Sequence, residues 1–114
     1  MSTGGSPMSR QEILDAPASA FPQLRQFLGG YFHQDWVIEH GTWEEVVGDF
    51  IVESPRHAVL DSAAELRDLL AAELTDSELA TVLERLGCSV DPSALHLSTG
   101  EWLREVLEEL SRQR

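Results

Sequence analysis

The sequence predicts an all-α protein, a single compact domain of four to six helices that follows a disordered N-terminal tail. Three observations lead to this fold class. Hydrophobic residues recur at spacings of three and four, three capping boxes head such segments, and strand-like alternation of useful length is missing. The 114 residues suit one hydrophobic core, and 42% hydrophobic residues is close to the globular norm, which excludes disorder of the whole chain.

Residues 1–20 are predicted to form the flexible tail. They open on Ser2-Thr3-Gly4-Gly5-Ser6-Pro7 and continue with small residues around Pro17, so they can bury little hydrophobic surface. Residues 21–114 are predicted to form the helical domain. Their net charge is −11 against −1 for the tail, so the acidity of the chain belongs to its folded part.

The first helix of the domain is expected to begin at Pro22, because a proline at the first helical position loses no hydrogen bond. Gly29-Gly30 weakens or ends it. Thr42-Trp43-Glu44-Glu45 is a capping box that starts a second helix, and Ser54-Pro55 closes that helix. Its hydrophobic stripe consists of Trp43, Val46, Val47, Phe50 and Ile51.

Residues 55–74 carry a further helical pattern, which a break near Asp61-Ser62 would divide. Two more capping boxes, residues 75–78 and 98–101, start the last two helices. Gly87 is placed to end the first of these in a left-handed conformation, and residues 88–97 are expected to form a loop.

The densest group of unusual side chains is the run Tyr31-Phe32-His33-Gln34-Asp35-Trp36. A carboxylate can orient an imidazole for general-base catalysis, so His33 and Asp35 are candidate catalytic residues and, with His40, candidate metal ligands. The alternative is that the aromatic residues pack in the core while the polar residues hydrogen-bond a helix junction. We favour this alternative, because no HExxH pair or cysteine cluster accompanies them, and we predict no catalytic residue, metal ion or cofactor.

The composition argues against several classes of function. Twenty acidic residues against eight basic ones give a net charge of −12, which disfavours nucleic acids and anionic membranes and favours basic partners. No hydrophobic run reaches the roughly 18 residues that span a bilayer, and the N-terminus does not read as a signal peptide. The single cysteine, Cys88, forms no internal disulfide, so we expect a cytoplasmic protein with Cys88 as a small packing residue.

Acidic residues concentrate between residues 26 and 55, where six carboxylates occur without an arginine. Glu45, Asp49 and Glu53 stand four apart, and like charges at that spacing cost roughly 0.2–0.5 kcal/mol per pair. The helix dipole favours Glu44 and Glu45 but does not account for Asp49 and Glu53. The row is either an ordinary solvated face or an interface for a cationic protein. The predicted binding residues are Asp35, Glu39, Glu44, Glu45, Asp49 and Glu53.

Gly48 lies in the middle of the second predicted helix, where a glycine costs about 1 kcal/mol relative to alanine. A residue without a side chain there would permit the close approach of another backbone.

Several segments resemble one bacterial family. The run from Phe27 to Trp36, residues 42–47, Leu86-Gly87-Cys88, Asp91-Pro92-Ser93 and residues 101–106 are similar to contact-dependent growth inhibition immunity proteins of the CdiI type. The likeness covers about residues 21–110, and Tyr31 to Trp36 is its most specific marker. It implies a small cytoplasmic protein that binds the C-terminal toxin domain of a contact-dependent or polymorphic toxin and neutralises it without catalysis.

Such toxins are often nucleases, and a nuclease needs a positive surface for its phosphate substrate, which an acidic protein would occupy. We therefore predict a cognate toxin domain as partner, no nucleic acid or membrane, and a monomer or weak dimer when free. We expect Tyr31, Phe32 and Trp36 to be largely structural and Asp35 to face outward. The alternative function is an acidic helical adaptor or antitoxin that binds a basic host protein, and the enzymatic alternative is a metal-assisted hydrolase.

Overall fold

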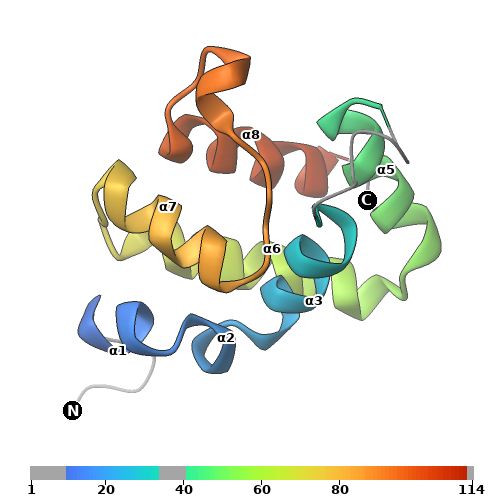
Figure 1. Ribbon diagram of the computed structural model, residues 1–114. Coiled ribbons are helices and arrows are strands. Elements are labelled where there is room, and N and C mark those ends of the chain that lie inside the picture. Colours follow the sequence, from blue (N-terminus) through green and yellow to red (C-terminus); the bar gives the residue numbers. More distant parts are fainter. Residues whose placement is uncertain (1–9, 34–40, 113–114) are drawn as a thin grey trace.

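The computed structural model describes residues 10–33 and 41–112, and these are helical without a β-strand. The all-α prediction is therefore confirmed. The described residues form seven α-helices, of which the five that follow residue 20 agree with the predicted four to six and the first two were not expected. The elements are α1 (Arg10–Asp15), α2 (Pro17–Ala20), α3 (Pro22–Tyr31), α5 (Trp43–Glu53), α6 (Arg56–Ala71), α7 (Asp76–Arg85), the 3-10 helix η1 (Pro92–Leu95) and α8 (Thr99–Arg112) (Figure 1).

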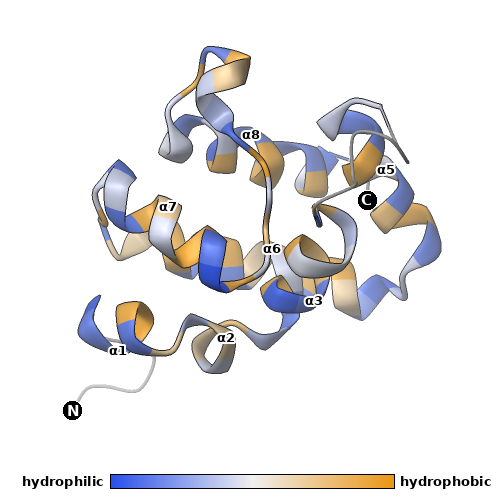
Figure 2. Cartoon of the chain, viewed as in Figure 1, coloured by the Kyte–Doolittle hydropathy of each residue, from blue (hydrophilic) through white to orange (hydrophobic). Residues whose placement is uncertain are grey.

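The core is organised around α8, which packs against α5, α6, α7 and η1. One side of α8 is fully buried, and its largest residue, Trp102, meets Phe32 edge-on with ring centroids 5.4 Å apart. Trp43, at the start of α5, lies 6.1 Å from the same indole in a similar arrangement. Figure 2 shows hydrophobic and hydrophilic residues alternating along the helices, as expected when each helix buries one face.

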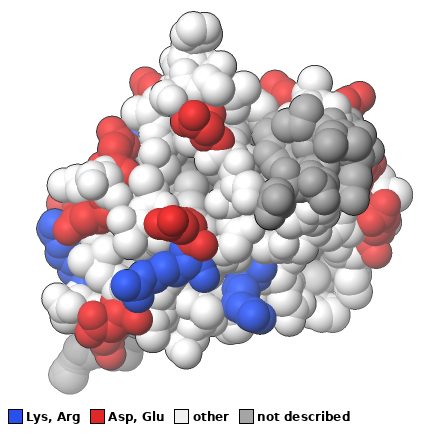
Figure 3. Space-filling model, in the orientation of Figure 1, with Lys and Arg blue, Asp and Glu red and all other residues white. Residues whose placement is uncertain are grey.

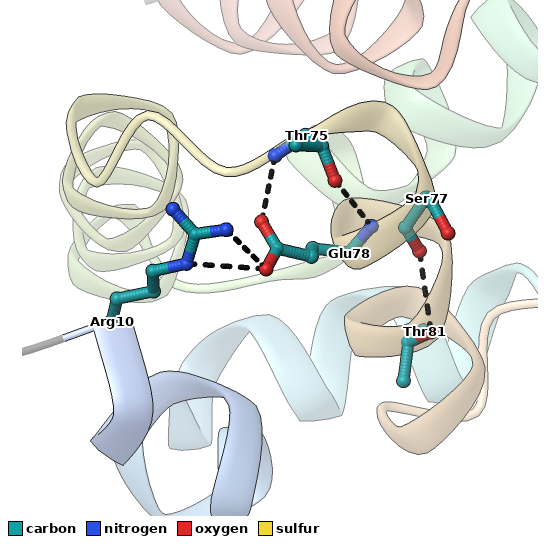
Figure 4. A network of polar contacts seen from close by, with 5 residues as sticks. All are labelled: Arg10, Thr75, Ser77, Glu78 and Thr81. Carbon is teal, nitrogen blue, oxygen red and sulfur yellow. Dashed lines mark hydrogen bonds and ion pairs between the residues drawn. The ribbon is translucent and has the colours of Figure 1, made fainter.

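The structure differs from the prediction at residues 10–20, which were expected to be part of the flexible tail. They form α1 and α2, which pack against α7, with α2 also against α3. Ile13 and Pro17 are buried, so even this short segment supplies hydrophobic surface to the core. Arg10 adds an ion pair with Glu78 of α7 (Figure 4). These contacts are long-range, and local composition does not reveal them. Residues 1–9 lie outside the described part of the chain.

All three predicted capping boxes are present. In the second, the backbone N–H of Glu78 donates to the Thr75 hydroxyl at 3.1 Å, and the Thr75 N–H donates to the Glu78 carboxylate at 2.9 Å (Figure 4). The boxes at Thr42 and Ser98 show the same reciprocal bonds. Three helices therefore begin where local sequence places them.

Two helix N-termini also receive caps from other helices. Glu65 of α6 accepts hydrogen bonds from the backbone N–H groups of Gln23 and Leu24, at 3.0 and 2.9 Å, at the start of α3. Residue 21, which precedes α3, is Phe21 and has no polar side chain to cap it. Asp76 of α7 accepts from the N–H of Gly100 in α8 at 3.0 Å. Carboxylates distant in sequence thus satisfy donors that a helix leaves unpaired.

Three further expectations are corrected or refined. Helix α3 continues through Gly29-Gly30 to Tyr31, and α6 runs unbroken past Asp61-Ser62, where Ser62 is buried. The predicted loop 88–97 contains η1. Gly87 does adopt the left-handed conformation, with φ +87°, and its backbone packs against Gly29. A Cβ at Gly29 would lie 2.6 Å from the Leu86 carbonyl oxygen, so this crossing requires glycine.

Replacing Glu65 with alanine should lower the free energy of unfolding by about 1–2 kcal/mol, because two N–H groups at the start of α3 lose their acceptor. Glu65→Gln retains a carbonyl oxygen in the same place and should lose less. Urea denaturation of both variants measures the difference. Equal losses in the two variants would show that the hydrogen bonds to α3 are not what Glu65 contributes.

Hydrogen bonds from Thr75 and then Arg10 lower the pKa of Glu78 below its ordinary value of 4.5. The stability it contributes is therefore complete above the pKa of the unfolded chain and is lost as the pH falls through the folded-state pKa. Thermal unfolding between pH 6 and pH 3 should decline less steeply in Glu78→Gln than in the unmodified chain. Parallel declines would contradict this assignment.

Candidate functional site

Helix α5 has one buried side and one side turned to solvent. Trp43, Val46, Val47 and Phe50 are buried, which confirms the predicted stripe, while Ile51 is half-buried. On the other side two parallel rows run along the helix, each with a spacing of four residues. The first row is Glu44, Gly48 and Val52, and the second is Glu45, Asp49 and Glu53. We call these six residues the outer face of α5.

The four carboxylates of the outer face differ in how the fold uses them. Glu45 is exposed but accepts the Thr42 N–H at 3.1 Å, so it caps its own helix. This arrangement requires Gly41, which has φ +95° and where a Cβ would lie 2.7 Å from the Glu45 carboxylate. Glu44 is exposed and Asp49 is half-buried.

Glu53 has a structural partner that the sequence did not indicate. Its carboxylate accepts a hydrogen bond of 2.7 Å from the Tyr31 hydroxyl at the end of α3. The Tyr31 ring packs edge-on against Phe50, with centroids 5.3 Å apart. Tyr31 therefore links α3 to α5, in line with its expected structural role, and folding accounts for part of what Glu53 does.

The structure describes only the first three residues of the predicted family motif, which runs from Tyr31 to Trp36. Phe32 is fully buried against Trp102, as expected, and His33 is half-buried. The remaining predicted residues lie outside the described part of the chain, namely Gln34, Asp35, Trp36 and Glu39, and so does His40.

Of the candidate catalytic and metal-binding residues, the structure describes only His33, because Asp35 and His40 lie outside the described residues. No group of three or more His, Cys, Asp or Glu side chains within residues 10–33 and 41–112 is placed to hold a metal ion. Cys88 is buried, and burial raises the pKa of its thiol to about 12, so it stays protonated and packs as a small hydrophobic residue. None of the helices in the described ranges is long and hydrophobic enough to cross a membrane.

The charge of the surface is uneven. Figure 3 shows basic side chains only in the left and lower part of the visible face, where acidic side chains lie beside them, while the upper and right parts show acidic side chains alone. Arg25 of α3 and Arg85 of α7 line a cleft of about 440 Å³ beside the Gly29–Gly87 crossing. Sequence reasoning missed this cleft because its two arginines are far apart in the chain. It also missed Val52, which lies outside the hydrophobic stripe of α5 and is 84% exposed.

The fold and this surface define a small helical domain whose charged groups lie mainly on its surface, around a hydrophobic core. The chain belongs to the CdiI immunity protein family, whose model matches residues 20–110. It is similar to a chain in the crystal structure of a CdiA-CT/CdiI complex from Y. kristensenii, with 29% identity and a TM-score of 0.75 over 80% of this chain and 98% of that one. No curated protein matches. The predicted resemblance to this family is thereby confirmed.

The Tyr31–Glu53 bond can be followed in solution, because Tyr31 is the only tyrosine of the chain. Burial, and then the hydrogen bond and charge of Glu53, raise the pKa of Tyr31 above its ordinary value of 10.0. The phenolate absorbance should therefore titrate above pH 10 in the unmodified chain. In Glu53→Gln the midpoint should fall without reaching 10.0, because burial persists. An unchanged midpoint would contradict the contact.

Proposed function

We propose that this protein binds the C-terminal toxin domain of a contact-dependent growth inhibition toxin and neutralises it by occupying its surface, without catalysis. The observation that carries this proposal is membership of the CdiI immunity protein family over residues 20–110. The likeness to a chain crystallised in a CdiA-CT/CdiI complex supports the same partner. The protein would act in the cytoplasm, where its single cysteine stays reduced.

We further propose that the outer face of α5 contacts the toxin. Glu44 is exposed and takes no part in the capping box, while Asp49 is half-buried and its charge acts on Tyr31. A row of like charges along a helix lowers the stability of that helix. A role in binding a cationic partner would explain why the row is present. Asp35 and Glu39, in the neighbouring segment, are proposed to extend this acidic surface.

Clustered carboxylates favour a cationic partner through their summed field. They raise the association rate and set the register of the complex more than they add to affinity at equilibrium. If the toxin is a nuclease, its substrate surface must be positive in order to hold phosphates. The acidic face of α5 would then compete with the phosphate backbone for that surface, which is the mechanism of neutralisation that we propose.

The test is the double variant Glu44→Arg/Asp49→Arg, assayed against the CdiA C-terminal toxin domain encoded next to this gene. We expect the affinity to fall at least about tenfold, mainly through slower association, and protection of toxin-expressing cells to fall with it. Binding kinetics at two salt concentrations measure the effect, because the unmodified pair should weaken more as salt rises.

A matched control keeps the change in net charge the same. Asp68→Arg/Glu84→Arg reverses two exposed carboxylates on α6 and α7. It should bind and protect like the unmodified chain. If both double variants weaken binding equally, the total charge matters and the α5 face does not. If the folded, unmodified chain fails to bind this toxin domain, the proposed function itself is wrong.

A further inference from the structure

The first row of the outer face of α5, which consists of Glu44, Gly48 and Val52, has an unusual composition. Gly48 lies in the interior of the helix, where glycine is a poor helix former. A Cβ built at Gly48 meets no heavy atom of the described residues within 4 Å, and its backbone does not have a positive φ. Neither internal packing nor backbone conformation in the described part of the molecule therefore explains the glycine.

One turn further along the same row stands Val52. It is 84% exposed, and no other large hydrophobic side chain within residues 10–33 and 41–112 is exposed. A single exposed valine is common on protein surfaces. Here, however, it lies one turn beyond Gly48, which is half-buried and has room for a side chain that it lacks, and the two residues form an uncharged strip beside the acidic row.

Carboxylates border this strip along one side and at its N-terminal end. Glu44 lies one turn before Gly48 in the same row, and Glu45, Asp49 and Glu53 run beside it. A hydrophobic contact next to polar groups is usual in a protein interface, in which a few residues supply most of the binding energy. The sign of the neighbouring charges specifies the occupant, because four carboxylates complement a cationic protein surface.

We infer that the Gly48–Val52 strip is the central contact of α5 with the toxin domain. Backbone of the toxin lies against Gly48, the Val52 side chain fills a shallow hydrophobic depression, and basic toxin residues meet the carboxylates beside the strip. This inference rests on the proposed function and deepens it. The carboxylates set the association rate and the register of the complex. The strip requires a close fit to the toxin surface and therefore determines which toxin is bound.

The inference predicts an opposition between stability and binding. Gly48→Ala should raise the midpoint of thermal unfolding by about 3–5 °C, because alanine favours the helix and its methyl group has room. The same methyl group would hold the toxin backbone away, so affinity should fall about tenfold. Val52→Ala removes two carbon atoms from a contact and should also weaken binding about tenfold, with unchanged or slightly higher thermal stability.

Gly30→Ala is the matched control. Gly30 is also a helical glycine, in α3, and a Cβ there meets no described heavy atom within 4 Å. Its replacement should leave toxin affinity unchanged. Thermal unfolding and calorimetric titration with the toxin domain, carried out on all three variants, provide both measurements.

The inference is supported if Gly48→Ala is more stable but binds more weakly, Val52→Ala binds more weakly without a loss of stability, and Gly30→Ala keeps its toxin affinity. Undiminished affinity in both α5 variants, while Glu44→Arg/Asp49→Arg still weakens binding, overturns the strip and leaves the proposed function standing. Equal losses in Gly30→Ala and Gly48→Ala would show that helix stiffening lowers affinity and would also overturn it. So would sedimentation data in which Val52→Ala abolishes self-association but not toxin binding, because the occupant would then be a second copy.

Discussion

The burial of one side of α8 is the constraint on which the rest of this structure depends. Trp102 lies at its start, and Phe32 and Trp43 pack edge-on around it, so the end of the α3 segment and the start of α5 are both positioned by this one indole. Further along, α8 packs against α6 and α7. In a domain of this size a single core must hold every helix, and a helix that contacts most of the others fixes their relative positions.

Five of the acidic side chains stabilise the fold by capping helix N-termini. Glu45, Glu78 and Glu101 close capping boxes, and Glu65 and Asp76 cap helices other than their own. These carboxylates are retained because helix N-termini leave backbone donors unpaired. Glu44 lies in the first turn of α5, where the helix dipole favours it, and the charge of Asp49 acts on Tyr31. The proposed toxin contact therefore rests on the whole row of carboxylates along the outer face of α5, in which Glu53 also accepts a hydrogen bond from Tyr31.

Helix α5 has a buried side that belongs to the core and an outer face that we propose binds the toxin. Its inner side fills the core against α8, α6 and α3, and the rigid attachment keeps its outer face in one orientation. A binding surface on a well-packed helix loses little conformational freedom when a partner binds, which favours tight inhibition. The glycine at position 48 weakens the helix slightly but leaves its backbone accessible. Such a sacrifice of local stability is typical of surfaces that are selected for contact with another molecule.

The sequence by itself determined the all-α class, the three capping boxes, the hydrophobic stripe of α5 and the left-handed Gly87, because each depends on residues within one or two turns of one another. It also indicated the family through the segment around Tyr31 to Trp36. Only the tertiary structure decided that residues 10–20 join the core through Ile13 and the Arg10–Glu78 pair, that Glu65 caps α3, that Glu53 holds Tyr31, and that Val52 stands exposed beside Gly48. The physical reason is distance along the chain. Periodicity shows which side of a helix is hydrophobic, but which distant side chain meets that helix, and which of its residues is left uncovered, is set by packing.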